Sequence, residues 1–74
     1  MIARLVWQPD DQDAPEALTA DIPADQLAEM RSLIGTDQWA SSEAVMWINC
    51  RAGDEPMAKR LFRLARITSL EPAN

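Results

Sequence analysis

The chain contains no histidine, no tyrosine and a single cysteine. Without histidine, the usual acid and base of catalysis near neutral pH is missing, and so is the imidazole ligand of Cys/His zinc sites. One cysteine cannot form a disulfide within the chain. The sequence therefore excludes histidine-based catalysis, mixed Cys/His zinc sites and a disulfide framework within one chain.

Glycines and long apolar runs are also scarce. The only glycines are Gly35 and Gly53, too few for a glycine-rich phosphate-binding loop. The longest apolar run has five residues, 44–48, whereas a membrane-spanning helix needs about 20. The first residues hold one arginine and no long apolar stretch, so no secretory signal is visible. These features predict a cytoplasmic protein.

What is abundant is negative charge. Twelve Asp and Glu against seven Lys and Arg give the 74 residues a net charge of −5, with 47% hydrophobic residues. Eight acids and two bases give residues 1–37 a net charge of −6, while four acids and five bases give residues 38–74 a net charge of +1. The composition predicts one folded domain, 1–74, and opposes a general attraction to nucleic acid or anionic lipid.

The first half predicts a strand, a loop and a helix. Apolar and polar residues alternate over 2–7, which indicates a half-buried strand. Residues 9–21 are acidic and contain two prolines, which predicts a loop with a short extended piece near 17–20. Over 23–34, the apolar stripe that includes Leu27 and Met30 predicts a helix.

The second half predicts two further helices. The first would begin between residues 36 and 42, run to Ala52 and stop at Gly53; a buried strand over 44–50 is the alternative, because its apolar run is continuous. A last helix is predicted over 56–68, with an apolar face opposite a basic stripe. The expected fold is therefore an α-rich α+β domain, with one N-terminal strand, an acidic loop and two to three short helices ending in an αα-hairpin.

No catalytic, metal or cofactor site is predicted. Cys50 has no histidine to deprotonate it and is expected to be a small core residue. The carboxylates of Asp10, Asp11 and Asp13 could bind a hard cation, but the glycine and glutamate spacing of a calcium-binding loop is missing, which favours a solvated acidic loop. The chain is therefore expected not to be an enzyme.

A small helix-turn-helix-like DNA-binding regulator is the alternative function. The predicted helix 56–68 carries Lys59, Arg60, Arg63 and Arg66, which are bases of the kind with which a recognition helix contacts phosphates. However, its start is acidic, at Asp54 and Glu55, and would repel phosphates. Direct binding of nucleic acid is therefore not the favoured prediction.

The middle segment predicts a protein interface. On a helical wheel, Met46, Trp47 and Cys50 form a second apolar side that one small chain has difficulty enclosing. Tryptophan and methionine are enriched where proteins meet. This side is expected to form a homodimer interface; a core position for it is the alternative.

The leading hypothesis is a non-catalytic, acidic protein-binding module that regulates or inhibits a partner. Acidic residues of the first half would contact a basic protein, such as one that binds nucleic acid, with apolar anchors beside them. The proposed contact residues are Asp10, Asp11, Asp13, Glu16, Trp7 and Trp39, with Leu18 as a further anchor. In composition alone, the chain resembles small acidic accessory proteins of phages and mobile elements, which implies an inhibitor of a host protein.

Overall fold

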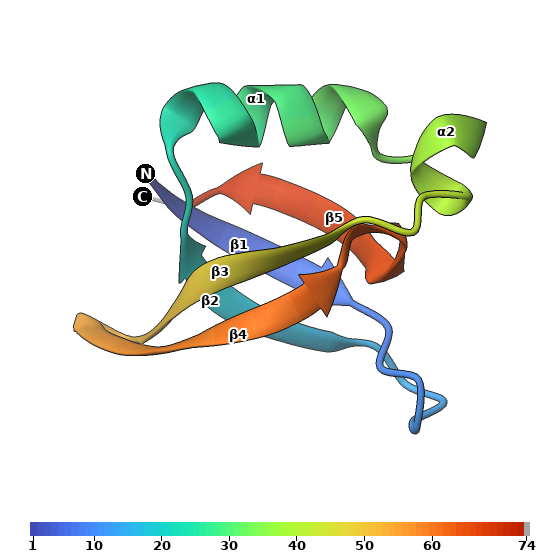
Figure 1. The fold of residues 1–74 in the computed structure, drawn as a ribbon. Helices are drawn as coiled ribbons and strands as arrows, with labels where there is room; N and C mark the ends of the chain where they lie inside the picture. The colour runs from blue at the N-terminus through green and yellow to red at the C-terminus, as the bar shows by residue number, and fades with distance from the viewer. Residues whose placement is uncertain (74) are drawn as a thin grey trace.

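The computed structural model describes residues 1–73 and is mainly β-sheet, with 48% strand and 23% helix. Five strands and three short helical segments follow one another along the chain (Figure 1). In order, they are β1 (Ile2–Trp7), β2 (Glu16–Asp21), α1 (Ala24–Leu33), α2 (Asp37–Ala40), β3 (Val45–Ala52), β4 (Glu55–Arg63), the 3₁₀-helix η1 (Leu64–Arg66) and β5 (Ile67–Pro72).

The five strands form one antiparallel sheet in the order β4-β3-β2-β1-β5. The edge strands are therefore β4 and β5. The sheet is strongly curled. Strands β2 and β3 separate β1 from β4 in the sheet, and yet the rings of Trp7 in β1 and Phe62 in β4 lie only 5.1 Å apart. Helix α1 lies across the inner face of this curled sheet (Figure 1).

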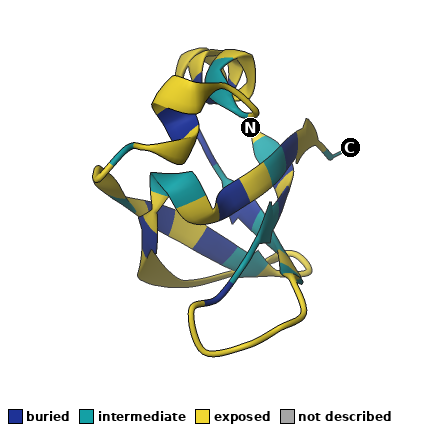
Figure 2. Ribbon diagram, turned by 90° about the vertical axis from the view of Figure 1, so that its right-hand side faces the viewer, coloured by how far each residue is buried: buried dark blue, intermediate teal, exposed yellow. Residues whose placement is uncertain are grey.

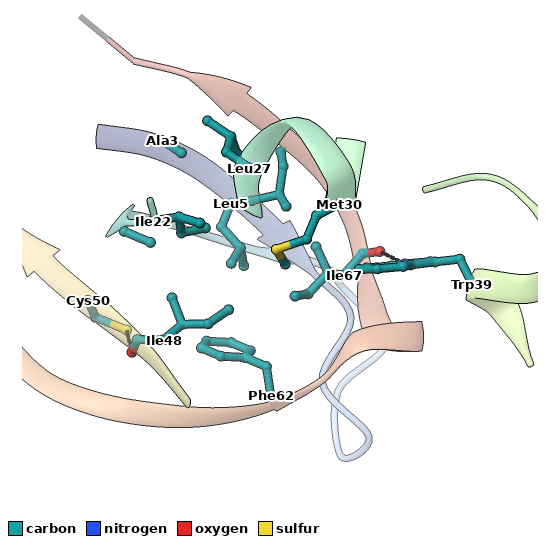
Figure 3. Close-up of a cluster of buried hydrophobic side chains, with 12 residues drawn as sticks. Ala3, Leu5, Ile22, Leu27, Met30, Trp39, Ile48, Cys50, Phe62 and Ile67 are labelled. Atoms are coloured by element: carbon teal, nitrogen blue, oxygen red, sulfur yellow. Dashed lines mark hydrogen bonds between the residues drawn. The ribbon is translucent and has the colours of Figure 1, made fainter. Parts of the chain in front are cut away.

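One hydrophobic core fills the space between the inner face and α1. Alternate residues of the strands point inward, as the bands of buried and exposed residues show (Figure 2), and α1 adds Leu27 and Met30 from above (Figure 3). The buried side chains are Ala3, Leu5, Ala20, Ile22, Leu27, Met30, Trp39, Ile48, Cys50, Phe62, Ile67 and Leu70.

Helix α2 is held to the sheet by one aromatic side chain. The Thr36 hydroxyl accepts a hydrogen bond from the backbone N–H of Trp39 (3.2 Å), which caps this short helix. The Trp39 indole is 5% exposed, and its N–H donates to the carbonyl oxygen of Ile67 at 2.9 Å (Figure 3). Trp39 therefore joins α2 to the beginning of β5.

The predictions for the first half are largely confirmed. Strand β1 and helix α1 lie where the alternation and the apolar stripe placed them. The acidic loop is shorter than expected, because Glu16–Asp21 forms a full strand along β1, with Leu18 opposite Leu5. The extended piece near 17–20 is the centre of that strand.

The predictions for the second half are wrong. The expected helix ending at Ala52 is the four-residue α2 followed by strand β3, so the strand alternative is the correct one there. The expected helix 56–68 is β4, η1 and the start of β5, and the αα-hairpin is a β-hairpin. The fold is therefore not α-rich, and the description of the chain as helical is incorrect. Pairing of β4 with β3 overrides the local helix preference of residues such as Met57 and Ala58.

The β3–β4 turn gives a testable prediction about Gly53. This residue has φ +61° and lies in the two-residue connection between the paired residues Ala52 and Glu55. A Cβ atom there would meet no atom within 4 Å, so the backbone conformation alone opposes a side chain. Gly53→Ala should lower the free energy of unfolding by about 1–2 kcal/mol, and Gly53→Asn by less, in urea denaturation. Equal stability of Gly53→Ala and the parent would contradict this account.

Candidate protein-docking surface

Large apolar side chains are exposed on the outer face of the β3–β4 hairpin, away from α1. Trp47 is 63% exposed, Val45 55% and Leu61 51%. Together with the two bases beside them, Lys59 and Arg63, we call these residues the outer patch. Exposed apolar side chains grouped in this way are typical of surfaces that bind another molecule.

The strand register places these five residues on one face. Trp47 lies opposite Leu61, and Val45 lies opposite Arg63. Directly opposed residues in an antiparallel pair share a face, and residues two apart along a strand return to it, which adds Lys59. The intervening residues Met46 and Ile48 point into the core instead. Trp47 was found from the sequence, whereas its neighbours on this face depend on a pairing that the helix prediction concealed.

Within residues 1–73, no strand pairs with the outer edge of β4. The N–H of Leu64 donates to the carbonyl of Ala44 at 3.0 Å, in the same register as the β3–β4 ladder. Hydrogen-bonded and non-hydrogen-bonded pairs alternate along an antiparallel ladder. Phe62 and Arg60 are therefore hydrogen-bonded to the residues opposite them on β3, Met46 and Ile48. It follows that the N–H and C=O groups of Lys59, Leu61 and Arg63 point away from β3, toward the free edge.

The two bases of the outer patch take part in no ion pair within residues 1–73, whereas other bases of the chain do. Arg31 pairs with Glu71 (2.9 Å), and Arg66 pairs with Asp10. Lys59 and Arg63 therefore leave positive charge on the edge of a chain whose net charge is −5.

Arg60 has a different environment from its two basic neighbours on β4. It lies opposite Ile48, on the inner side of the strand. Its guanidinium carbon lies 5.1 Å from the ring centre of Trp7 and 5.6 Å from that of Phe62. A cation over an aromatic face contributes favourably to packing, so Arg60 covers the open end of the core rather than joining the outer patch.

A shallow hollow lies beside the outer patch. Its volume is about 160 Å³, and its lining includes Trp47 and Met46 of β3 together with Pro23 and Gln26 near the start of α1. The hollow is large enough to receive one side chain of a bound partner.

Strand geometry separates the three residues predicted as a homodimer interface. Trp47 faces outward, whereas Met46 packs against the core and Cys50 is 5% exposed within it. Burial raises the pKa of the Cys50 thiol above its ordinary value of 9.0, and the positive charge of Arg60 opposes that rise only in part. The thiol is therefore protonated at neutral pH. Met46, Trp47 and Cys50 cannot form one shared surface; dimerisation itself stays a prediction.

The acidic loop between β1 and β2 projects away from α1 (Figure 1). Asp10 is paired with Arg66, and Asp11 and Asp13 are exposed. Glu16 lies at the start of β2, opposite Trp7. Residues 1–73 contain no group of three or more Cys, Asp and Glu side chains placed to hold a metal ion. Contact of this loop with a basic partner stays a prediction.

The apolar anchors expected beside the acidic loop lie inside the protein. Trp39 belongs to the core, and Leu18 packs against it. Trp7 packs edge-on against Phe62, and its indole N–H is buried with no hydrogen-bond partner in the described part of the chain. None of the three offers the loop an exposed apolar contact of the kind that Trp47 provides on the outer patch.

The helix-turn-helix alternative loses its recognition helix. Lys59, Arg60 and Arg63 lie on strand β4, with side chains on both of its faces, and Arg66 lies in η1. No single helical stripe of bases exists over residues 56–68 to enter a DNA groove. None of the helices formed by residues 1–73 has the length and apolar character required to cross a lipid bilayer.

No protein family, no curated protein and no solved structure matches the chain.

Proposed function

We propose that this chain is a non-catalytic protein-binding module that docks through the outer patch of β3 and β4. The observation that carries the proposal is the position of Trp47, 63% exposed and directly opposite the half-exposed Leu61. A tryptophan side chain left in water forgoes the stabilisation that burial provides, about 25 cal/mol per Å² of apolar surface. Its burial against a partner recovers that free energy.

The composition of the outer patch supports a protein as the partner. Tryptophan is among the residues that contribute most to binding when a partner covers them, and aliphatic neighbours such as Val45 exclude water from around it. Two of its three apolar side chains, Val45 and Leu61, are aliphatic and provide no flat platform on which bases stack, so the outer patch as a whole suits a protein surface better than a nucleic acid.

Regulation or inhibition of the partner would then follow from occupancy alone. A module of 74 residues that covers a surface of another protein prevents other ligands from reaching it, and it needs no reacting group. The environment of Cys50 is consistent with this role. The residue is 5% exposed, and this burial raises the pKa of the thiol, so the thiol stays protonated.

The proposal is tested by comparative capture. The immobilised parent chain and a Trp47→Ser/Leu61→Ser variant are exposed to lysate of the source cell, and bound proteins are quantified by mass spectrometry. The amount of a specific partner recovered on the variant should be at least tenfold lower than on the parent, because each interface anchor contributes about 2 kcal/mol or more to binding. Both replaced side chains are exposed, so the variant should keep its thermal unfolding midpoint within a few degrees.

The matched control is Gln38→Ala, an exposed position on α2 and outside the outer patch. It should retain the partner at the parental level. Equal recovery of every protein on the parent and the folded double variant would refute docking through the outer patch.

A further inference from the structure

The free edge of β4 is a second feature of the outer patch, and it restricts what can bind there. The backbone groups of Lys59, Leu61 and Arg63 point outward from the sheet, as the ladder register requires. An edge with unpaired N–H and C=O groups pairs with any extended segment that can reach it. Pro56 lacks an N–H, so the edge available for pairing is limited to residues 57–63.

We infer that this edge takes up an extended segment of the partner as a sixth strand, and that the segment reads acid–x–apolar–x–acid. The inference rests on the proposed function and names the chemistry of the partner. Residues of an added strand that lie opposite Lys59, Leu61 and Arg63 turn their side chains to the same outer face. The central apolar residue then contacts Leu61, and an acidic residue lies beside each base.

Charge complementarity carries the choice of acidic residues. Lys59 and Arg63 lie on either side of Leu61 and have no ion-pair partner within residues 1–73. Because the two bases are four residues apart on one strand face, an added strand can place one acidic residue beside each base and one apolar residue between them. The motif is symmetric, so it fits an added strand of either direction.

A second copy of this chain fits the same edge less well. Antiparallel pairing of two β4 strands that places Arg63 beside Glu55 also places Lys59 beside its own copy, at the centre of the contact. Like charges directly opposite each other are destabilising. Each copy also carries a net charge of −5, which opposes their approach.

The test uses a fluorescein-labelled synthetic peptide, GTETVTETG, which carries the motif and no other charged side chain. Fluorescence anisotropy should report saturable binding to the full chain. Amide hydrogen exchange should slow at Lys59, Leu61 and Arg63 in the complex, because these edge N–H groups become hydrogen-bonded to the peptide. Protection at these three amides distinguishes strand addition from contact with the side chains alone.

Charge exchange supplies the matched controls. A Lys59→Glu/Arg63→Glu variant should bind GTETVTETG at least tenfold more weakly. It should instead bind the charge-reversed peptide GTKTVTKTG, in which lysines replace the two glutamates. An Arg4→Glu/Arg31→Glu variant changes the net charge equally, with both substitutions away from β4. Its affinity for GTETVTETG should stay within about threefold of that of the parent. Its affinity for the charge-reversed peptide should rise less than that of the Lys59→Glu/Arg63→Glu variant.

Several results would overturn the inference. Absence of GTETVTETG binding, while Trp47→Ser/Leu61→Ser still loses its captured partner, would remove the sixth strand and leave the proposed function standing. Peptide binding without protection of the three amides would do the same. A dimer of the chain alone that protects these amides would assign the edge to a second copy. Oligothymidylate that displaces the peptide and protects the same amides would assign the edge to nucleic acid.

Discussion

Trp39→Ala should lower the free energy of unfolding by about 3–5 kcal/mol, as replacement of a buried large aromatic residue does. The indole is 5% exposed and donates a 2.9 Å hydrogen bond to the Ile67 carbonyl, so the variant loses both packing and a buried polar contact. A domain of this length has roughly 4–11 kcal/mol of stability, at about 0.05–0.15 kcal/mol per residue. A large fraction of the molecules should therefore be unfolded at 37 °C, as measured by circular dichroism and urea denaturation.

Trp39→Phe separates the two contributions. Phenylalanine keeps much of the ring volume but has no N–H, so the Ile67 carbonyl loses its partner and the loss should be about 1–3 kcal/mol. Gln38→Ala, on the exposed side of the same short helix, should change stability by no more than about 0.5 kcal/mol. A Trp39→Ala variant as stable as Gln38→Ala would contradict the core position of the indole.

The elements that could be predicted from the sequence are those whose two faces differ. Strand β1 alternates between inward Ala3 and Leu5 and outward Arg4, and α1 has one apolar stripe with Leu27 and Met30 at its centre. Burial of one face leaves a period of two or of 3.6 residues in the sequence. These periods identified both elements.

Strand β3 was concealed because both of its faces are apolar in its first half. Met46 and Ile48 point into the core, while Val45 and Trp47 point outward, so apolar residues follow one another without a break over residues 44–48. A continuous apolar run does not distinguish a strand from a buried helix. The outward apolar residues that hid the strand, Val45 and Trp47, belong to the outer patch.

Strand β4 was concealed for a different reason. Eight of its nine residues are exposed, so burial leaves almost no period of two. Its composition, with Met57, Ala58, Lys59 and Leu61, favours a helix locally. Only the connection at Gly53 and the pairing with β3 make it a strand, and pairing between strands is a tertiary property that local preference does not encode.

This leaves Phe62 as the one residue that fixes β4 to the core. It is 2% exposed, whereas every other residue of the strand is exposed, and its ring meets Trp7 edge-on at 5.1 Å with an interplanar angle of 87°. Such a contact adds about 0.5–1.5 kcal/mol beyond the burial of the two rings. Phe62→Ala should therefore lower the free energy of unfolding by about 3–5 kcal/mol.

The neighbouring residue provides the matched control for this prediction. Leu61→Ala changes the next position on the same strand, where the side chain points outward and is 51% exposed, so the free energy of unfolding should change by no more than about 0.5 kcal/mol. Phe62→Leu keeps an apolar side chain in the core and loses the edge contact with Trp7, which predicts an intermediate loss of about 1–1.5 kcal/mol.

The two positions should also differ in what they do to binding. In conditions where Phe62→Ala is still folded, amide hydrogen exchange should quicken along β4 and the β3–β4 turn more than in β1, because the hairpin has lost its anchor. Capture of a partner should then weaken although the outer patch is chemically intact. Leu61→Ala should weaken capture with exchange unchanged. Equal exchange along β4 in Phe62→Ala and the parent would mean that strand pairing with β3 alone holds the docking edge in place.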